Sequence, residues 1–500
     1  MPLEFRKPRL ALRRWLISGL ATRQKMPRRF KLVFAVLIFS LSFATRSLQA
    51  VDLGPTMYTL DQPFGGLTRS YDQRAVSILN GDGLLGPYDI EPAQTNWLAQ
   101  APGYSIYLSC IYRVFGRDFF KVQLIQNGLN SLAPILILMI AGQVVSWRVG
   151  VVSGLLAALS HHLSHISNFL LPDSLAALPI LAAVQFIVVA RHSRRDPYWC
   201  YLSAGLMLGL AAWLRSQTML ASPFLAVTLL LIATHRLAAV KRVAVMVIVS
   251  FLTIAPITIR NLLVYGELIP INIGVGIVLW EGIADASGDR FGAVAQDEEV
   301  AAQEAVLYGD SRYAGSWSTP DGIQRDRDRI NKSLAIIREH PFWYAGVMLG
   351  RMREMVKYSA HAPLVFGIKQ ARALDRTAPI RTGWESIATD GSSAAVGRGA
   401  FWMRPVIRPL QRLTKEAMQL MIAIGVVALF AASLRRAVFV ATVPLYYLLF
   451  QSFVHTEFRY TLPMQYFVVV FAAIAWVAIG AAIWQALGHV INRNTALEQA

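Results

Sequence analysis

The sequence has few charged side chains for its length. Asp, Glu, Lys and Arg make up only 16% of its 500 residues, against roughly 25% in an ordinary globular chain. So few charges cannot cover several soluble domains, and a hydrophobic share of 55% excludes a disordered chain. The mean hydropathy is +0.44. The composition therefore predicts an integral membrane protein and argues against a soluble enzyme.

Cysteine and acidic residues are also scarce. With only Cys110 and Cys200 present, the chain has no disulfide framework and no Cys-rich metal site. Its 30 Asp and Glu are outnumbered by 48 Lys and Arg, so the formal net charge is +18. In a chain this apolar, a basic excess is expected as anchoring charge on the cytoplasmic side of a membrane. Membrane lipids are therefore expected partners, and nucleic acid is not.

Long apolar stretches predict the fold. The first, at 32–44, follows a basic cytoplasmic segment at 1–31. It is either a signal peptide cut after Ala50 or a short uncleaved helix, and we favour the helix. Both alternatives place residue 51 onward outside the cytoplasm. The other stretches approach the ~17–25 residues that a spanning helix needs, at 122–145, 149–167, 170–190, 198–214, 217–234, 243–259, 416–434, 437–454 and 463–486.

The connections between these stretches indicate the orientation, because basic residues favour short cytoplasmic loops. With the N-terminus inside, the short outer connections hold only Arg215 and Arg459. The sequence thus predicts an all-α polytopic membrane protein with about ten transmembrane helices and both termini inside. The short inner loops hold Arg148, Arg191, Arg194, Arg195, Arg236, Lys241, Arg242, Arg435 and Arg436.

The predicted topology leaves two long segments outside the membrane. A large first exterior loop covers 51–121, and an exterior or interfacial segment at 260–415 precedes the last three spans. Within the second segment, the run at 325–329 alternates in sign and predicts salt bridges. Arg351 and its neighbours are expected on the solvated side of an interfacial helix. Residues 487–500 are expected to form a cytoplasmic tail.

Polar residues gather at the outer ends of the spans. The middles of the spans lack the charges that mark the path of a transporter. The pattern predicts an active site at the membrane surface, and the alternative is that outer ends are polar because they meet water. The residues at these ends are Gln123, Gln126, Asn127, Asn130, His161, His162, His165, Asp173, Arg215, Arg260, Asn261, His455, Glu457 and Arg459.

Short motifs spread over residues 65–480 carry a family resemblance. They lie at 71–83, 101–104, 111–116, 170–175, 209–215, 259–266 and 458–463. Together they resemble GT-C glycosyltransferases, in particular bacterial relatives of dolichyl-phosphate-mannose–protein mannosyltransferases. Many members have an acid shortly before the position of Tyr71, whereas this chain has Asp72 directly after it, with Asp61 as the reserve.

The resemblance implies a fold and an activity. Residues 32–486 are expected to form a GT-C-like module that moves a hexose or pentose from a polyprenyl-phosphate donor. The acceptor is expected to be a lipid, a glycan or a protein on the exterior face of the plasma (inner) membrane. This reaction needs a carboxylate to take the proton of the acceptor hydroxyl. It also needs cations to stabilise the departing phosphate.

Two acids are the candidate catalytic residues. Asp72 is expected to be the general base, and the alternative is a solvated loop carboxylate. Asp173 is the second acid, which would orient the acceptor or bind a metal. Its alternative is structural, since Pro172 and Asp173 suit the first turn of a helix.

The candidate binding residues are mainly cationic. Arg459 is expected to hold the lipid phosphate, and its alternative is an interfacial anchor. Arg260 and Arg215 are likewise expected to contact the phosphate. Asn261 is expected to bind sugar hydroxyls, and Tyr71 is the remaining residue expected to bind substrate. No cofactor is assigned and a divalent metal stays open, although for His161 and His165 we favour helix-end packing over metal binding.

Two rival functions remain open at this point. One is a transporter or flippase for a lipid-linked glycan, which charges in the middle of the spans would favour. The other is a catalytically inactive family member that acts as a scaffold, which the shifted acid near Tyr71 keeps open.

Overall fold

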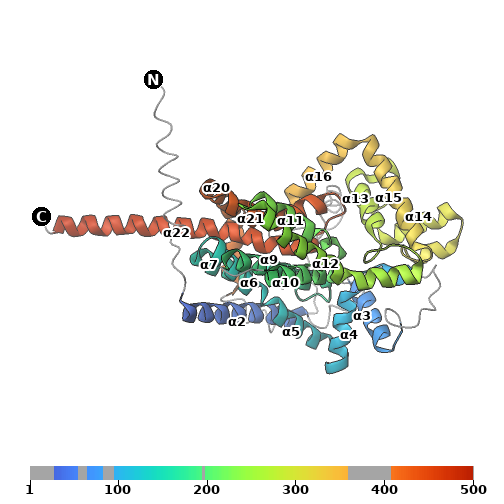
Figure 1. Cartoon of the computed structure of the whole chain (residues 1–500), viewed down its shortest axis with the longest axis horizontal. Helices are drawn as coiled ribbons and strands as arrows, with labels where there is room; N and C mark the ends of the chain where they lie inside the picture. Colours follow the sequence, from blue (N-terminus) through green and yellow to red (C-terminus); the bar gives the residue numbers. More distant parts are fainter. Residues whose placement is uncertain (1–26, 54–64, 83–94, 194–197, 358–406, 499–500) are drawn as a thin grey trace, which may run out of the picture.

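The computed structural model describes residues 27–53, 65–82, 95–193, 198–357 and 407–498. Within these ranges the chain is helical and contains no β-strand. Figure 1 shows a bundle of long helices with a smaller group of helices, α13 to α16, at one end. We call this smaller group the lobe. The expected all-α fold is confirmed.

The bundle consists of apolar helices packed side by side. α22 contacts α7, α9, α20 and α21, and it projects beyond the rest of the bundle at the end away from the lobe (Figure 1). α10 packs on both α9 and α12. The bundle helices are α2 (Arg28–Leu53), α5 (Phe119–Asn130), α6 (Ala133–Val144), α7 (Trp147–Leu159), α9 (Pro172–His192), α10 (Tyr198–Leu214), α11 (Ala221–Leu231), α12 (Arg236–Tyr265), α20 (Ile407–Ala432), α21 (Leu434–Ser452) and α22 (Leu462–Glu498).

Small residues allow α10 and α12 to approach closely. A Cβ added at Gly209 would clash with the side chain of Thr253, and one added at Gly205 would clash with the carbonyl oxygen of Met246. Close backbone approach at small residues is a common way for helices to associate in lipid, where apolar side chains gain little from leaving the membrane. A larger residue at either glycine would push the two helices apart.

Several helices could cross a bilayer. Large apolar side chains on α12 face outward, since Leu252 is 64% and Leu263 is 69% exposed, as lipid contact requires. The chain is therefore a multi-pass membrane protein. Five described segments are long and apolar enough to span, namely Arg29–Val51, Phe119–Val144, Pro172–His192, Arg236–Tyr265 and Phe458–Gln485.

Some expected spans are divided in the structure. The stretch at 149–167 was expected to be one helix, but it forms α7 and the short helix α8 (His161–Ile166). Ser160 causes the break, because its side chain accepts a hydrogen bond from the backbone N–H of Leu163 and so caps α8. The stretch at 437–454 forms α21, which is not among the helices apolar enough to span.

The lobe is attached to the bundle through the connection that follows α21. Arg351 donates to the carbonyl oxygens of Ser452, at 3.1 Å, and of Gly282. Arg351 is only 3% exposed, so the prediction that it lies on a solvated side is wrong. It is buried because its guanidinium group lies between the backbone of α13 and the end of α21. The lobe helices are α13 (Val275–Ser287), α14 (Asp297–Tyr308), α15 (Gly322–Glu339) and α16 (Pro341–Val356).

The alternating run at 325–329 forms salt bridges, as predicted. Arg325 and Arg329 both bind the buried carboxylate of Glu304, at 2.7 and 2.6 Å. Between them, Asp326 accepts hydrogen bonds from the backbone N–H groups of Gly274, at 3.2 Å, and Gly276, at 2.9 Å. The run therefore fixes α15 against both α13 and α14.

Candidate active site

Three helix ends meet where the bundle joins the lobe. α9 begins with Pro172 and Asp173, α10 ends just before Arg215, and the short helix η5 (Phe458–Thr461) contains Arg459. Proline and an acid are favourable in the first turn of a helix, because the ring fixes φ and the acid complements the helix dipole. Local sequence preferences therefore account for the position of Asp173 at the start of α9.

Asp173 and Arg215 form a buried ion pair. The Nε of Arg215 lies 3.0 Å from Oδ1 of Asp173, and Nη2 contacts the same oxygen. The second oxygen, Oδ2, is buried and has no hydrogen-bond partner. The pair thus leaves one carboxylate oxygen able to accept a further hydrogen bond.

Arg459 and Glu457 form a second buried pair. Nη2 of Arg459 lies 3.0 Å from Oε1 of Glu457, and Nε contacts the other oxygen. The guanidinium groups of Arg459 and Arg215 lie 4.9 and 4.7 Å from the ring centre of Tyr460. Both cations therefore contact one aromatic ring, which joins the two ion pairs into one group.

His455 connects this group to the lobe. Its Nδ1 lies 2.5 Å from Asp285 on α13, and its Nε2 lies 3.7 Å from Glu457. Burial alone would lower the pKa of His455, but the hydrogen bonds to Asp285 and Glu457 outweigh it and raise the pKa to about 10. Burial opposes ionisation of Glu457, but Arg459 outweighs it and lowers the pKa of Glu457 to about 2. His455 and Glu457 are therefore both charged at neutral pH.

Tyr71 lies beside the same charges. It belongs to α3 (Gly65–Leu79), is 4% exposed, and contacts the ring of Tyr104 edge-on at 5.2 Å. Burial raises the pKa of Tyr71, whereas the positive charge of Arg215 acts to lower it. The structure therefore brings together four of the predicted site residues, Tyr71, Asp173, Arg215 and Arg459.

Asp72 points away from this group. Successive residues of a helix are turned about 100° from each other, so Asp72 faces α4 (Gly103–Phe115) and the turn that follows it. Its carboxylate accepts from the hydroxyl of Tyr112 at 2.8 Å and from Nη2 of Arg117 at 2.5 Å. Asp72 is 3% exposed, so the alternative of a solvated loop carboxylate is wrong. Its reserve, Asp61, lies outside the described residues.

Asn261 and Arg260 lie at the C-terminal end of α12. The amide group of Asn261 donates to the carbonyl oxygens of Ile269, at 3.0 Å, and Ile271, at 2.9 Å. Arg260 donates to the amide oxygen of Asn261 at 3.2 Å and lies over the ring of Tyr265. These contacts hold the segment after α12 and use both amide hydrogens of Asn261.

The polar side chains of α5 also support the backbone. Gln126 donates to the carbonyl oxygens of Ser167 and Phe169, both at 2.8 Å, and Gln123 donates to that of Asn168 at 2.9 Å. These side chains were expected to face the membrane surface, but they are fully buried and hold the segment that leads to Asp173. On α8 the rings of His161 and His165 lie 5.9 Å apart. Among the described residues, no three His, Cys, Asp or Glu side chains are grouped to hold a metal ion.

Sequence reasoning gave no role to Tyr460 or Asp285. The sequence did contain a signal for part of this group of ion pairs. His455, Glu457 and Arg459 lie two residues apart, and their side chains are basic, acidic and basic in turn. Asp285 is 170 residues away from His455 in the sequence, and only the fold brings it into contact.

One family model matches part of the chain. Residues 99–259 match the model described as dolichyl-phosphate-mannose-protein mannosyltransferase. The matched part runs from just before α4 into α12 and includes Asp173 and Arg215. No curated protein sequence matches the chain.

Solved structures share the fold. The oligosaccharyltransferase of Archaeoglobus fulgidus in its apo form is 13% identical, with a TM-score of 0.52, and the match covers 93% of this chain and 52% of that one. AglB of the same organism, in complex with an inhibitory peptide and a dolichol-phosphate, is also 13% identical, with a TM-score of 0.51 and coverage of 92% and 52%. ArnT of Cupriavidus metallidurans, bound to undecaprenyl phosphate, is 13% identical over 91% and 79% of the two chains, with a TM-score of 0.37.

The chain spans about half the length of the oligosaccharyltransferases that it matches. At 13% identity this likeness shows the fold alone. The predicted resemblance and fold class are both confirmed. The chain shares its fold with the archaeal oligosaccharyltransferases, and its residues 99–259 match the family model described as dolichyl-phosphate-mannose-protein mannosyltransferase.

Proposed function

We propose that this protein is an integral membrane glycosyltransferase that moves a hexose or pentose from a polyprenyl-phosphate donor to a lipid, glycan or protein acceptor. The reaction takes place on the exterior face of the plasma (inner) membrane. The family match covers the helices that carry Asp173 and Arg215. One of the proteins that share the fold was solved in complex with a dolichol-phosphate.

The observation that carries this proposal is the group formed by Asp173, Arg215, Arg459 and Tyr460. It combines a carboxylate that has one unsatisfied oxygen with two guanidinium groups on a single aromatic ring. In glycosyl transfer the acceptor oxygen attacks the anomeric carbon while the bond from that carbon to the phosphate oxygen breaks. The carboxylate takes the acceptor proton, and the cations stabilise the charge on the departing lipid phosphate.

The contacts favour Asp173 over Asp72 as the general base, whereas the sequence predicts the reverse. The sequence predicts Asp72 as the base, with Asp173 in support. In the structure both oxygens of Asp72 are engaged, by Tyr112 and Arg117, whereas Oδ2 of Asp173 has no partner. We therefore propose Asp173 as the acid that faces the acceptor, and Asp72 as the acid that holds α3 against α4.

The phosphate is assigned to the two arginines of the group. Arg459 and Arg215 each offer the planar guanidinium that phosphate oxygens favour, and each is held by a buried acid. Arg260 lies with Tyr265 rather than Tyr460, so we propose a secondary role for it.

The test is sugar transfer by the purified full chain in proteoliposomes. We expect labelled sugar to pass from a polyprenyl-phosphate donor to an added acceptor mixture, with free polyprenyl phosphate released in equal amount. Mass spectrometry of surface glycans and glycolipids from cells with and without the protein would identify the acceptor. Movement of the lipid-linked sugar across the bilayer without transfer would support the flippase. If no polyprenyl phosphate were released with any donor tested, the result would support a catalytically inactive scaffold.

A further inference from the structure

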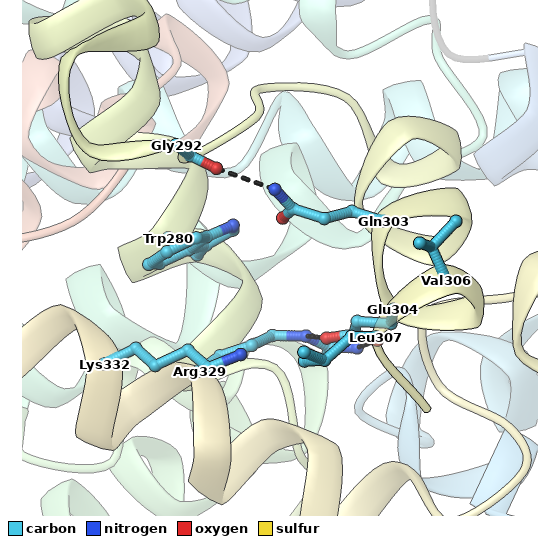
Figure 2. Close-up of a pocket in the computed structure, with 8 residues that line it drawn as sticks. All are labelled: Trp280, Gly292, Gln303, Glu304, Val306, Leu307, Arg329 and Lys332. Carbon is cyan, nitrogen blue, oxygen red and sulfur yellow. Dashed lines mark hydrogen bonds and ion pairs between the residues drawn. The ribbon is translucent and has the colours of Figure 1, made fainter. Parts of the chain in front are cut away.

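The lobe contains a cavity that lies apart from the candidate active site. It has a volume of about 410 Å³ and lies between α13, α14 and α15 (Figure 2), within the range of roughly 300–1,000 Å³ typical of small-molecule sites. Trp280 lines it, and Trp280 is turned about 140° around the axis of α13 from Asp285, which contacts His455. One helix therefore separates the cavity from the cluster of ion pairs.

The wall formed by α14 and α15 has an excess of positive charge. Glu304 accepts three hydrogen bonds, one from Arg325 and two from Arg329, at 2.6–2.7 Å. Its two oxygens are therefore shared between two cations. The nearby carboxylate of Asp326 is engaged by the N–H groups of Gly274 and Gly276. The buried acids are thus already used in holding the lobe together.

Two cationic groups remain for a ligand. Arg329 is only 2% exposed, and its Nη1 is buried without a hydrogen-bond partner. A buried donor without a partner costs free energy, which an anionic ligand oxygen would recover. Lys332, one turn further along α15, also lines the cavity and forms no ion pair with any described residue.

The remaining wall is largely apolar. Figure 2 shows the indole ring of Trp280 lying across the cavity, with its nitrogen directed toward α14. Leu307 and Val306 of α14 complete this wall, and the amide of Gln303 is held across the mouth by a 2.7 Å hydrogen bond to the carbonyl oxygen of Gly292. A ligand that fits must combine an apolar face, which covers the indole, with a negative charge.

We propose that this cavity binds an anionic sugar unit, such as a uronic acid or a phosphorylated sugar. Its negative group would contact Arg329 and Lys332, and its ring face would cover Trp280. The choice of a sugar rests on the proposed function. The unit bound here would belong to the acceptor at a distance from the reacting hydroxyl, because α13 lies between the cavity and the ion pairs.

Direct binding tests the proposal without any donor. Glucuronic acid, glucose 6-phosphate, glucose and inorganic phosphate are titrated into the purified, detergent-solubilised full chain, and binding is measured by calorimetry. We expect the two anionic sugars to bind at least about tenfold more tightly than glucose and than inorganic phosphate, since charge-assisted hydrogen bonds and ring contact both contribute. Equal affinity for glucose, or for phosphate alone, would overturn the proposal.

Variants locate the binding to this cavity. Lys332→Glu should weaken the binding of glucuronic acid by at least about tenfold. Arg338→Glu makes the same change of charge on an exposed residue of the same helix that does not line the cavity, and it should leave the affinity unchanged. Arg329 is unsuitable, because its replacement would break the buried contacts to Glu304. Unchanged affinity in Lys332→Glu would refute the site, while a failure of sugar transfer would not affect the binding result.

Discussion

Arg215 contacts Asp173 through a single carboxylate oxygen. Its Nε lies 3.0 Å from Oδ1 and its Nη2 contacts the same atom, while Oδ2 is buried without a partner. A guanidinium usually binds both oxygens of a carboxylate when geometry allows. Here the guanidinium binds one oxygen and also lies over the ring of Tyr460, which Arg459 contacts as well. Oδ2 is therefore the oxygen of Asp173 that can accept a further hydrogen bond.

Arg459 is expected to be necessary for transfer. Arg459→Lys keeps the positive charge but loses the planar fork that contacts both oxygens of Glu457. We expect transfer from a polyprenyl-phosphate donor to fall by about tenfold or more. Arg459→Leu should abolish transfer and also lower the melting temperature, because a buried acid is left without its partner. Arg353→Leu, on an exposed residue of α16, is the control. A normal rate in Arg459→Leu would favour the anchoring alternative.

The ion pairs that link Asp285, His455, Glu457 and Arg459 predict a pH range of greatest stability. The pKa of His455 is raised from 6.5 to about 10, so its contribution is complete below pH 6.5 and is lost as the pH rises through 10. The pKa of Glu457 is lowered from 4.5 to about 2, so its contribution is complete above pH 4.5 and is lost as the pH falls through 2. We expect the melting temperature of the detergent-solubilised protein to be highest between pH 4.5 and 6.5.

Two histidine variants separate this effect from general alkaline unfolding. His455→Gln should lower the melting temperature at pH 6 and should flatten its fall between pH 6.5 and 10. His235→Gln changes an exposed histidine and should follow the parent protein at every pH. If the parent and His455→Gln lost stability in parallel above pH 6.5, the protonated imidazole would not be a stabilising group.

The predicted orientation can be tested with reporters at two described helix ends. A reporter after Ser193, at the end of α9, should behave as cytoplasmic, and one after Ser287, at the end of α13, should behave as exterior. The opposite pair of results would invert the topology and move the ion-pair cluster to the cytoplasmic face. Two reporters on one side would contradict the three spans expected between them, at 198–214, 217–234 and 243–259, because an odd number of crossings must place the reporters on opposite sides.

Apolar stretches predicted most of the helices, because hydrophobic runs of this length have few alternatives to a helix in lipid. The same reasoning missed the break at Ser160, since one serine that caps a helix hardly changes the hydropathy of a window. It also missed the burial of Arg351. The apolar length of a stretch determines that a helix forms, but tertiary contacts determine which of its polar residues meet solvent.

The candidate site was predictable to the extent that its residues lie at the ends of helices. Asp173, Arg215 and Arg459 follow or precede apolar stretches, and an alternating topology brings such ends to one side. The direction of each side chain was not predictable. Tyr71 and Asp72 are adjacent in the sequence and both contact α4, yet Tyr71 lies beside Arg215 whereas Asp72 binds Arg117. The partnership of His455 with Asp285 depends on how the lobe packs, which no local pattern encodes.

The two acids should differ in what their replacement does. Asp173→Asn is nearly isosteric but removes the negative charge beside Arg215, so we expect transfer to fall by roughly 10²–10⁴-fold. Asp72→Asn should weaken the contact with Arg117 and lower the melting temperature, with a smaller loss of rate if its role is to hold α3. Asp310→Asn, which disrupts the surface ion pair with Arg312, is the matched control and should leave the rate unchanged.

The measurement is sugar transfer from a polyprenyl-phosphate donor by purified, detergent-solubilised variants, with the amount of folded protein checked by size-exclusion chromatography. A larger loss of rate in Asp72→Asn than in Asp173→Asn would return the general base to Asp72, as the sequence predicts. Full activity in both, with activity lost in Asp61→Asn, would move the base to Asp61 and leave the proposed function intact. Full activity in all three single variants and in the double variant of Asp72 and Asp173 would remove base catalysis by these residues, because none of the three carboxylates would then be needed to take the acceptor proton.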